Sequence, residues 1–592
     1  MSTNQDASPE TMTTADFRER VLLAVHDGES QEVVLGPEGD QLTVNGNEAL
    51  VLAKLQFRRS LRFVKVTFTE FVDLAEATFE RSLRFENCTF QKGLRLRDVR
   101  VGGLLSLAGC TIQEAGPGFV DARRLRVDGL IDLSLVTSKV GWDLTNLRAG
   151  DDLRLDGIQV TAKLNEKEDI PQQADLADRG HLEREMLGKA LNLEGADIAK
   201  HVYVYKGTDE HKRGATFKGS TDLRAKIGGG VGFLGAKLEH ASGLAVDMQG
   251  AEVGESVLFR DGTTVEGGVD LRAKIGGQVA FAKATLERPN GLAVNMEGAE
   301  VCGSVFFRDG TSVNGEIDLR AKIGGQVDLA KATLEHPNGK AVNMVSAEVG
   351  GAVFFRDSTS VNGEIDLRAK IGGQVGIVGA ILENLDGKAV NMVGAEVGRS
   401  VFFRHGTFLR GVVDLTQARL RNGFYATNEP YQKTFAIPVE RDQNIKNLTI
   451  LGELRMAYAE ITGPCLFHHV HVWGRIHARH LTVHGDLDFC GSIIGPGDSS
   501  EEFAEQQLSA ASVPWTEDQW TKARTWQAAE VERKPPEEKT QQPNTTSSTS
   551  TSTPVNFEMA EVHGSFWARG TRVLGTLTLE DAEIAGEANF DG

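Results

Sequence analysis

The chain has 592 residues, a formal net charge of −19 and five scattered cysteines. It contains no apolar run of about 18 residues and does not start with a basic segment followed by an apolar one, so we expect neither a membrane helix nor a signal peptide. Without an export signal, an odd number of cysteines argues against a disulfide framework, and we expect a cytoplasmic location.

The acidic charge is concentrated in two segments of the chain. Residues 1–50 carry ten acidic and two basic side chains, and residues 497–555 carry ten and five. Residues 50–126 have the opposite balance, with fourteen basic and eight acidic side chains. A protein that mimics DNA needs acidic columns on a rigid surface, so this distribution argues against DNA mimicry, and we do not expect nucleic acid as a partner.

The N-terminal 49 residues are expected to form a disordered tail, over 1–13, and then a helical cap. The stretch from Thr14 to Val25 predicts a helix, because Phe17, Val21 and two further apolar residues fall on one face. Thr14 suits the N-cap position of this helix. Irregular strands are expected from its end to about residue 50.

Residues 50–160 repeat with a period of 11. Apolar pairs such as Val72/Leu74 and Leu83/Phe85 flank one polar residue, which is the period of a strand. Two periods make one coil of about 22 residues, and nothing recurs at the helical period, so a β-solenoid explains the pattern. The helix at 14–25 would cover its open N-terminal end.

A charged segment at 161–190 interrupts the rhythm and is expected to leave the solenoid as an excursion from a corner. From 191 to 424 the period becomes 48 residues. The string Asp-Leu-Arg-Ala-Lys-Ile-Gly-Gly begins at Asp222, Asp270, Asp318 and Asp366. Each unit has two similar halves, which predicts two coils of about 24 residues with glycine-containing corners.

Short loops are expected at one recurring corner of these units, starting at Glu239, Glu287, Glu335 and Glu383. A second excursion is expected over 425–447, followed by coils over 448–496. Residues 497–555 predict an acidic, tryptophan-bearing insertion with helices and a Thr/Ser linker. Final coils are expected over 556–592, and the chain stops within a repeat, so we expect the insertion or another molecule to cover that end.

Several pieces of the repeat have the pattern Val-Asp-Leu-x-x, as in Val72-Asp-Leu-Ala-Glu, Val269-Asp-Leu-Arg-Ala and Val413-Asp-Leu-Thr-Gln. This pattern resembles pentapeptide-repeat proteins. The resemblance implies an all-β fold, a right-handed quadrilateral β-helix, over roughly 50–495 and 556–592. The 48-residue double unit is also similar to large actinobacterial β-helix proteins with a C-terminal membrane segment, which this sequence lacks. We therefore expect a bacterial β-helix with a short helical N-terminal cap and a disordered or helical insertion near the C-terminus.

The charged residues of the repeat form one outward column when the two halves are aligned. Its members are Lys226, Glu252, Lys274, Glu300, Lys322, Glu348, Lys370 and Glu396. The signs alternate from coil to coil, so neighbours attract and wrong registers are rejected. We interpret the column as a stacking device. An Asp/Asn column that includes Asp270, Asn295, Asp318 and Asn343 is expected to serve the corners.

A row of outward apolar side chains is the first candidate partner surface. In Val305-Phe-Phe-Arg308 the flanking Val305 and Phe307 are expected to point inward, which turns Phe306 outward. The equivalent residues are Leu258, Phe354 and Phe402, and an arginine follows each at Arg260, Arg308, Arg356 and Arg404. Exposed rows of this kind mark contact surfaces, unless an excursion of the same chain lies over them.

Two further clusters are candidate sites. Trp515, Trp520 and Trp526 lie within the insertion, and we expect them to dock on the solenoid itself or on a partner. His469 and His471 flank the inward Val470 and are expected to share a face, and His484-Gly and His563-Gly are expected to stack once the insertion is discounted. These four histidines are weak candidate metal ligands, with a solvated or stacked cluster as the alternative reading.

No nucleophile elbow, phosphate loop or dinucleotide-binding motif occurs in a suitable context, so we assign no catalytic residue and no cofactor. We expect a non-catalytic rigid scaffold or protein-interaction rod with a protein partner. The alternatives are a self-assembling, bactofilin-like β-helix that forms homo-oligomers through an open C-terminal end, a β-helix enzyme acting on a polymer where the repeat breaks, and an acidic DNA-mimicking rod.

Overall fold

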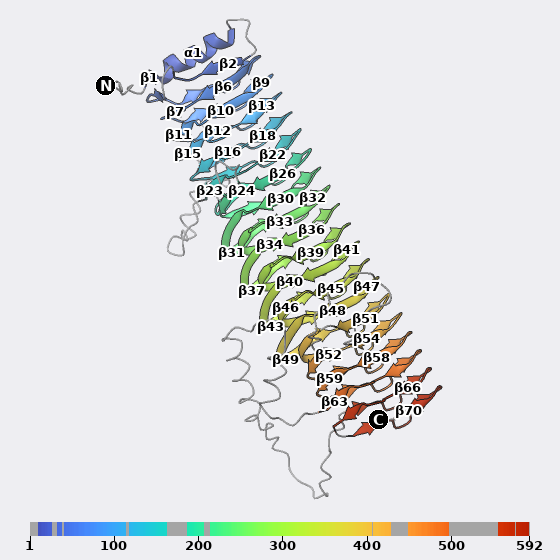
Figure 1. Ribbon diagram of the computed structural model, residues 1–592. Helices are drawn as coiled ribbons and strands as arrows, with labels where there is room; N and C mark the ends of the chain where they lie inside the picture. The colour runs from blue at the N-terminus through green and yellow to red at the C-terminus, as the bar shows by residue number, and fades with distance from the viewer. Residues whose placement is uncertain are drawn as a thin grey trace, which may run out of the picture. The chain divides into compact units, whose positions relative to one another are not determined.

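The computed structural model describes residues 10–26, 32–37, 41–113, 118–162, 186–206, 213–404, 406–427, 448–495, 555–574 and 576–590. The chain divides into two compact units. Unit 1 comprises residues 1–354 and 359–373, and unit 2 comprises residues 355–358 and 374–592. Each unit is a β-solenoid of parallel strands (Figure 1), so the expected all-β fold is confirmed.

The first turns of unit 1 carry four short strands each. One turn contains β7 (Val66–Phe68), β8 (Val72–Asp73), β9 (Thr78–Phe79) and β10 (Leu83–Glu86), and β11 (Thr89–Phe90) starts the next. Each strand pairs in parallel with the strand one turn further on, as β7 does with β11. The four strands of a turn make the predicted four-sided coil.

We name two of the faces after their sheets, because the candidate sites lie on them. Sheet B of unit 1 contains β2 (Glu32–Leu35), β6 (Ser60–Val64), β10, β14 (Leu105–Ser106), β18 (Ile131–Asp132), β22 (Leu153–Arg154), β26 (Val202–Tyr205), β30 (Val231–Leu234), β33 (Val257–Arg260), β36 (Val279–Ala282), β39 (Val305–Arg308) and β42 (Val327–Ala330). Sheet C of unit 1 contains β5 (Gln56–Phe57), β9, β13 (Arg100–Val101), β17 (Arg126–Val127), β21 (Arg148–Ala149), β25 (Asp197–Ile198), β29 (Lys226–Ile227), β32 (Glu252–Val253), β35 (Lys274–Ile275), β38 (Glu300–Val301), β41 (Lys322–Ile323), β44 (Glu348–Val349) and β47 (Lys370–Ile371).

The 48-residue repeats depart from the expected pair of equal coils. Pairing of Lys274 with Glu300 and of Glu300 with Lys322 makes successive turns 26 and 22 residues long. Two faces also merge into one strand, which alternates between a long form, such as β37 (Thr285–Asn295), and a short form, such as β40 (Ser312–Asp318). The long strands contain the segments predicted as corner loops. The extra residues are taken up as a shift of register within the strand, here between Glu287 and Leu292.

The Asp/Asn column holds the corners, as predicted. The Asp270 side chain accepts a hydrogen bond from the backbone N–H of Arg272 at 3.1 Å and pairs with its guanidinium at 2.6 Å. Asp318 and Arg320 show the same arrangement in the next 48-residue repeat. An aspartate that bonds both the backbone and the side chain two residues on explains why the string Asp-Leu-Arg recurs.

Inward side chains form the core of each unit by stacking on their equivalents in neighbouring turns. In unit 1 the rings of Phe233, Phe259, Phe281 and Phe307 stack with centroid separations of 4.8 Å. Cys88 and Cys110 are buried in the inward small-residue position, as expected. In the part of the chain that the structure describes, no helix is long and apolar enough to cross a membrane.

One helix, α1 (Thr14–His26), covers the N-terminal turn and confirms the predicted cap. Phe17 is fully buried, and its ring lies 6.2 Å from that of Phe63 and 5.9 Å from that of Phe68. The N-cap is Thr13 and not Thr14, because the Thr13 Oγ1 accepts the N–H of Asp16. Residues 10–13 do not belong to a disordered tail as predicted, since β1 (Glu10–Thr13) pairs with β3 (Leu42–Asn45).

Unit 2 continues with the same geometry. Its sheet B contains β48 (Val375–Val378), β51 (Val401–Arg404), β54 (Phe424–Thr427), β58 (Cys465–His468), β62 (Leu487–Asp488), β66 (Phe566–Trp567) and β70 (Ala588–Asn589). The pairing of β62 with β66 shows that the solenoid resumes directly after residues 496–554. Those residues, together with 163–185 and 428–447, lie outside the described part, and so do the predictions made for them.

Candidate interaction surface

The outer side of sheet B in unit 1 carries the predicted apolar row. Parallel pairing places Gly232, Leu258, Ala280, Phe306 and Asp328 on successive turns of one column. Large side chains therefore alternate with smaller ones. The side chains of Leu258 and Phe306 are half-buried, while their neighbours in the same strands, Val257 and Phe307 among them, fill the core. The predicted inward and outward directions agree with these burial patterns.

An arginine lies over the ring of Phe306. The Arg308 guanidinium carbon is 3.7 Å from the ring centroid, which is cation–π geometry. Arg308 Nη2 also lies 2.5 Å from a carboxylate oxygen of Asp328, which is fully buried. Asp328 therefore fixes the guanidinium against the ring and leaves one edge of Phe306 toward solvent.

Unit 2 repeats the arrangement on its own sheet B. The rings of Phe402 and Tyr425 stack at 5.1 Å, and the Arg404 guanidinium lies 4.4 Å from the centroid of Phe402. Further along the same column, Arg569 lies 4.9 Å above Trp567. An outward aromatic ring followed two residues later by a covering arginine is thus a recurrent feature of this face.

The remaining members of the predicted row lie on β45 (Val353–Arg356), which the unit boundary crosses. Phe354 belongs to unit 1 and is half-buried, and Arg356 belongs to unit 2.

Sequence reasoning missed two tyrosines on this face of unit 1, of which Tyr203 extends the row and Tyr205 lies in the column of Arg260. Tyr203 stands one turn before Gly232 in the same column, and its ring lies 5.2 Å from that of His201. Tyr205 lies over Gly232, where an added Cβ would come within 2.8 Å of the ring. Burial raises the pKa of both phenols. Alignment of Val202-Tyr-Val-Tyr205 with the Val-Phe-Phe-Arg pieces would have revealed them.

A hollow of about 370 Å³ lies beside Phe306 on this face. Ala280 and Ala282 contribute small side chains, and Arg260, Gln278 and Arg308 stand around them. A small residue in alternate turns therefore creates a depression beside Phe306. Its lining carries both signs of charge, because Asp261 and Asp309 stand there together with the cationic residues. Such a depression accepts a large apolar side chain with polar or charged neighbours.

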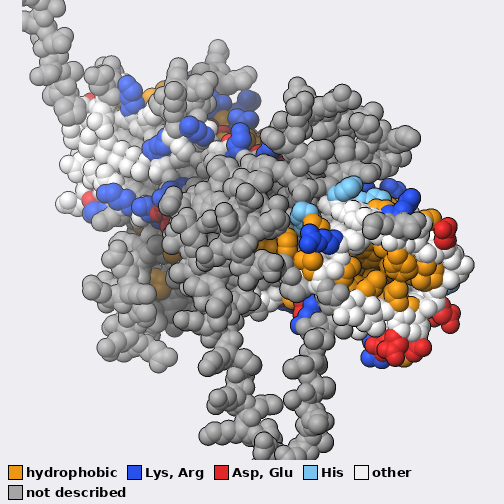
Figure 2. All heavy atoms as spheres, turned by 60° about the horizontal axis from the view of Figure 1, so that its bottom comes forward, with side chains coloured by type: hydrophobic (Ala, Val, Ile, Leu, Met, Phe, Trp, Pro, Cys, Tyr) orange, Lys and Arg blue, Asp and Glu red, His pale blue; other side chains and the backbone are white. Residues whose placement is uncertain are grey.

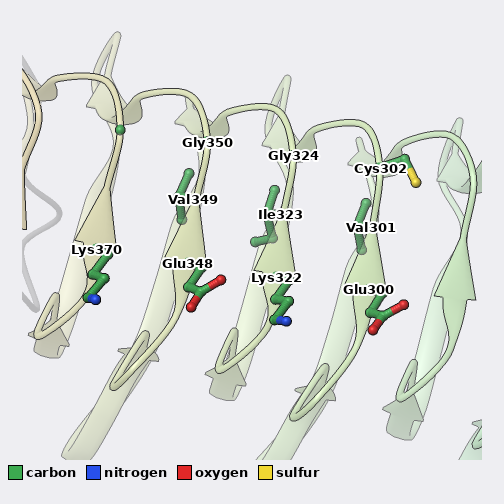
Figure 3. Close-up of a pocket in the computed structure, with 11 residues that line it drawn as sticks. Glu300, Val301, Cys302, Lys322, Ile323, Gly324, Glu348, Val349, Gly350 and Lys370 are labelled. Carbon is green, nitrogen blue, oxygen red and sulfur yellow. The ribbon is translucent and has the colours of Figure 1, made fainter.

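The charged column of sheet C has the predicted alternating register. In Figure 3, Lys370, Glu348, Lys322 and Glu300 occupy equivalent positions on neighbouring strands. The shallow groove of about 510 Å³ beside them is lined by the buried Val301, Ile323 and Val349 and by corner glycines. The same set of charged and apolar positions recurs in every 48-residue repeat, which agrees with a stacking role.

The histidine predictions have a mixed outcome. His484 and His563 do stack, with ring centroids 4.6 Å apart, and Glu460 lies 3.7 Å from His484. His469 and His471 do not share a face, because His469 turns the corner before β59 (Val470–Trp473) with a φ of 55°.

His471 and His468 have different environments. Burial lowers the pKa of His471. His468 pairs with Asp488 at 2.9 Å. Within the described residues, no three His, Cys, Asp or Glu side chains gather as metal ligands would.

The last described turn exposes side chains of the inward type. Phe590 is 52% exposed, and Leu577 and Ile584 are half-buried. Figure 2, turned to bring this region forward, shows hydrophobic side chains gathered there. Trp515, Trp520 and Trp526 lie outside the described residues, as do most of the two breaks in the repeat at which an enzyme site was considered.

Comparison with protein families gave one match. Residues 57–111 match the family described as Pentapeptide repeats (9 copies). This stretch lies within the regular four-stranded turns of unit 1, and the match and the fold together support a pentapeptide-repeat β-helix. No curated protein and no solved structure matched the chain.

Proposed function

We propose that this chain is a non-catalytic scaffold that binds a protein partner through the outer side of sheet B. The observation that carries the proposal is the column of outward aromatic rings with covering arginines, which occurs within each unit. Stacking between turns does not require it, because the same column also accepts Gly232 and Ala280. A pentapeptide-repeat β-helix is consistent with a structural or interaction scaffold.

The chemistry of the face defines the partner. Leu258 and Phe306 offer apolar edges, and Arg260 and Arg308 stand beside them. The complementary surface presents large apolar side chains with carboxylates next to them. Aromatic residues and arginine are also the types that contribute most to protein interfaces.

The test is partner capture followed by reconstitution with the purified partner. We expect the combined substitution of Phe306, Phe354 and Phe402 by Ser to weaken binding at least tenfold, because each anchor typically contributes roughly 1–2 kcal/mol. Leu385→Ser is the matched control, since Leu385 is an exposed apolar side chain outside sheet B. Unchanged binding by the triple variant, with circular dichroism showing an intact fold, would refute the proposal.

Self-assembly is the second candidate, and the exposed Phe590 favours it. Apolar cross-sections and unpaired strands at the end of a solenoid associate with similar surfaces. Sedimentation of the full chain over a wide concentration range distinguishes the two functions. Phe590→Asp should abolish any association without affecting partner capture through sheet B.

A further inference from the structure

Three arginines occupy consecutive positions in the outer column of sheet C. Parallel pairing sets Arg100 of β13 against Arg126 of β17, and Arg126 against Arg148 of β21. All three side chains are exposed. Because parallel strands lie about 4.8 Å apart, three positive charges stand within about 10 Å of one another.

The rest of this column in unit 1 avoids such contacts. From Asp197 onward its sign alternates at each turn, through Lys226, Glu252 and Lys274 and on to Lys370. Like charges directly opposite each other destabilise a sheet. The arginine run is therefore a local exception in a column that elsewhere follows the favourable pattern, and stacking does not account for it.

Nearby arginines form ion pairs with carboxylates, whereas these three form none, although Asp197 lies opposite Arg148 on the next turn. On the corner before sheet C, Arg124 pairs with Asp98 at 2.6 Å and Arg123 with Asp121 at 2.8 Å. Among the residues that the structure describes, none forms an ion pair with Arg100, Arg126 or Arg148. Their guanidinium groups are thus available to an anion from outside the chain.

The residue type points to oxyanions of planar or tetrahedral geometry. Within unit 1 the alternating part of the column uses lysine for its positive charges, while the unpaired run uses arginine. In unit 2 the arginine of the column, Arg419, alternates with Glu396 and Glu460. A guanidinium binds phosphate or carboxylate through two parallel hydrogen bonds, which an ammonium group cannot do. The choice of arginine therefore indicates direct recognition of such an anion.

The freedom of the backbone that carries the anions separates phosphate from carboxylate. Side chains on one side of an extended peptide recur at about 6.6 Å and fall out of register with turns about 4.8 Å apart. A nucleic-acid strand carries one phosphate per nucleotide on a backbone that can adjust its path along a basic groove. Contrary to the expectation from the charge distribution of the whole chain, we propose that Arg100, Arg126 and Arg148 bind the phosphate backbone of single-stranded nucleic acid. The described outer column holds no aromatic residue for bases to stack on, so the binding is independent of base sequence.

The experiment measures fluorescence anisotropy of a labelled oligo-dT of about 20 nucleotides with the full chain, from about 50 to 200 mM NaCl. The variant replaces Arg100, Arg126 and Arg148 by Gln. We expect its affinity at low salt to fall at least about tenfold. The slope of log K against log salt should decrease by about 2, since each phosphate contact on a single strand contributes about 0.7.

The matched control replaces Lys226, Lys274 and Lys322 by Gln. It removes three exposed positive charges from the same column and should leave the slope unchanged and the affinity within about twofold, because each of these lysines has an acidic residue opposite it on both neighbouring turns. Equal losses in both variants, or no saturable binding by the unmodified chain at about 50 mM salt, would overturn the proposal. Tighter binding of a duplex or of poly-glutamate through the same arginines would assign the site to that ligand instead.

Discussion

Asp366 lies at a corner that recurs in each 48-residue repeat, and two cationic side chains stabilise its ionised carboxylate. Lys340 is 2.9 Å and Arg368 2.6 Å from the fully buried carboxylate. Burial opposes ionisation, but hydrogen bonds from Arg368 and Lys340 outweigh it, so the pKa lies below the ordinary value. A depressed pKa adds stability above the unfolded pKa of about 4, and this stability is lost as the pH falls through the folded value.

We therefore expect Asp366→Ala to cost about 1–3 kcal/mol at neutral pH, because it removes the acceptor for the backbone N–H of Arg368 as well as both ion pairs. Asp366→Asn should cost less, since Asn343 accepts the equivalent backbone N–H. Urea unfolding between pH 3 and 7 measures both, and the Asn variant should lose stability less steeply below pH 4 than the wild type. Identical pH profiles would contradict this account.

Arg126 provides a second test at the scale of one residue. Arg126→Glu places a carboxylate between Arg100 and Arg148 and restores the alternation seen in the rest of the column. We expect a higher midpoint of urea unfolding at low salt and a gain that shrinks as salt is added, because exposed charges are screened. A lower midpoint at low salt would show that the arginines do not repel each other.

At the scale of elements, α1 depends on one deeply buried ring. Phe17→Ala should destabilise the N-terminal turns by about 3–5 kcal/mol, since the ring fills the end of the core against Phe63 and Phe68. Leu23→Ala, on the 54% exposed side of the same helix, is the control and should be nearly neutral. Hydrogen exchange of the amides in β2 and β3 measures the effect, and equal exchange in both variants would contradict the assigned role.

The elements also show how far sequence reasoning reached. The 48-residue period predicted that Phe306 and Leu258 are equivalent and that the Lys and Glu positions form one column. The burial of these side chains and the register of their strands therefore followed from the spacing. The merged strands and the unequal turns could not be predicted, because a four-residue insertion can leave a sheet as a loop or be absorbed as a bulge. His469 was misplaced for a related reason, since only backbone geometry shows that it turns a corner. The arginine run was visible as an excess of charge but not as a column.

Within each unit the described strands pair with those of the adjacent turns, so disturbances should remain local. In such proteins stability is a sum of terms within turns and between adjacent turns. We expect Phe281→Ala to speed amide exchange in β33 and β39, whose Phe259 and Phe307 stack on it, and to leave β13 and β17 unchanged. Exchange followed by mass spectrometry measures this, and uniform loss of protection throughout unit 1 would contradict it.

The alternation of long and short strands has a consequence for how this protein can change its length. Turns of 26 and 22 residues follow one another, and the charges of sheet C change sign with each turn. Deleting residues 270–317 removes one turn of each kind and leaves every junction as it was. Deleting a single turn instead sets lysine beside lysine and places two strands of the same kind together. We therefore expect duplications and deletions in this region to be tolerated in even numbers of turns, that is, in whole 48-residue repeats.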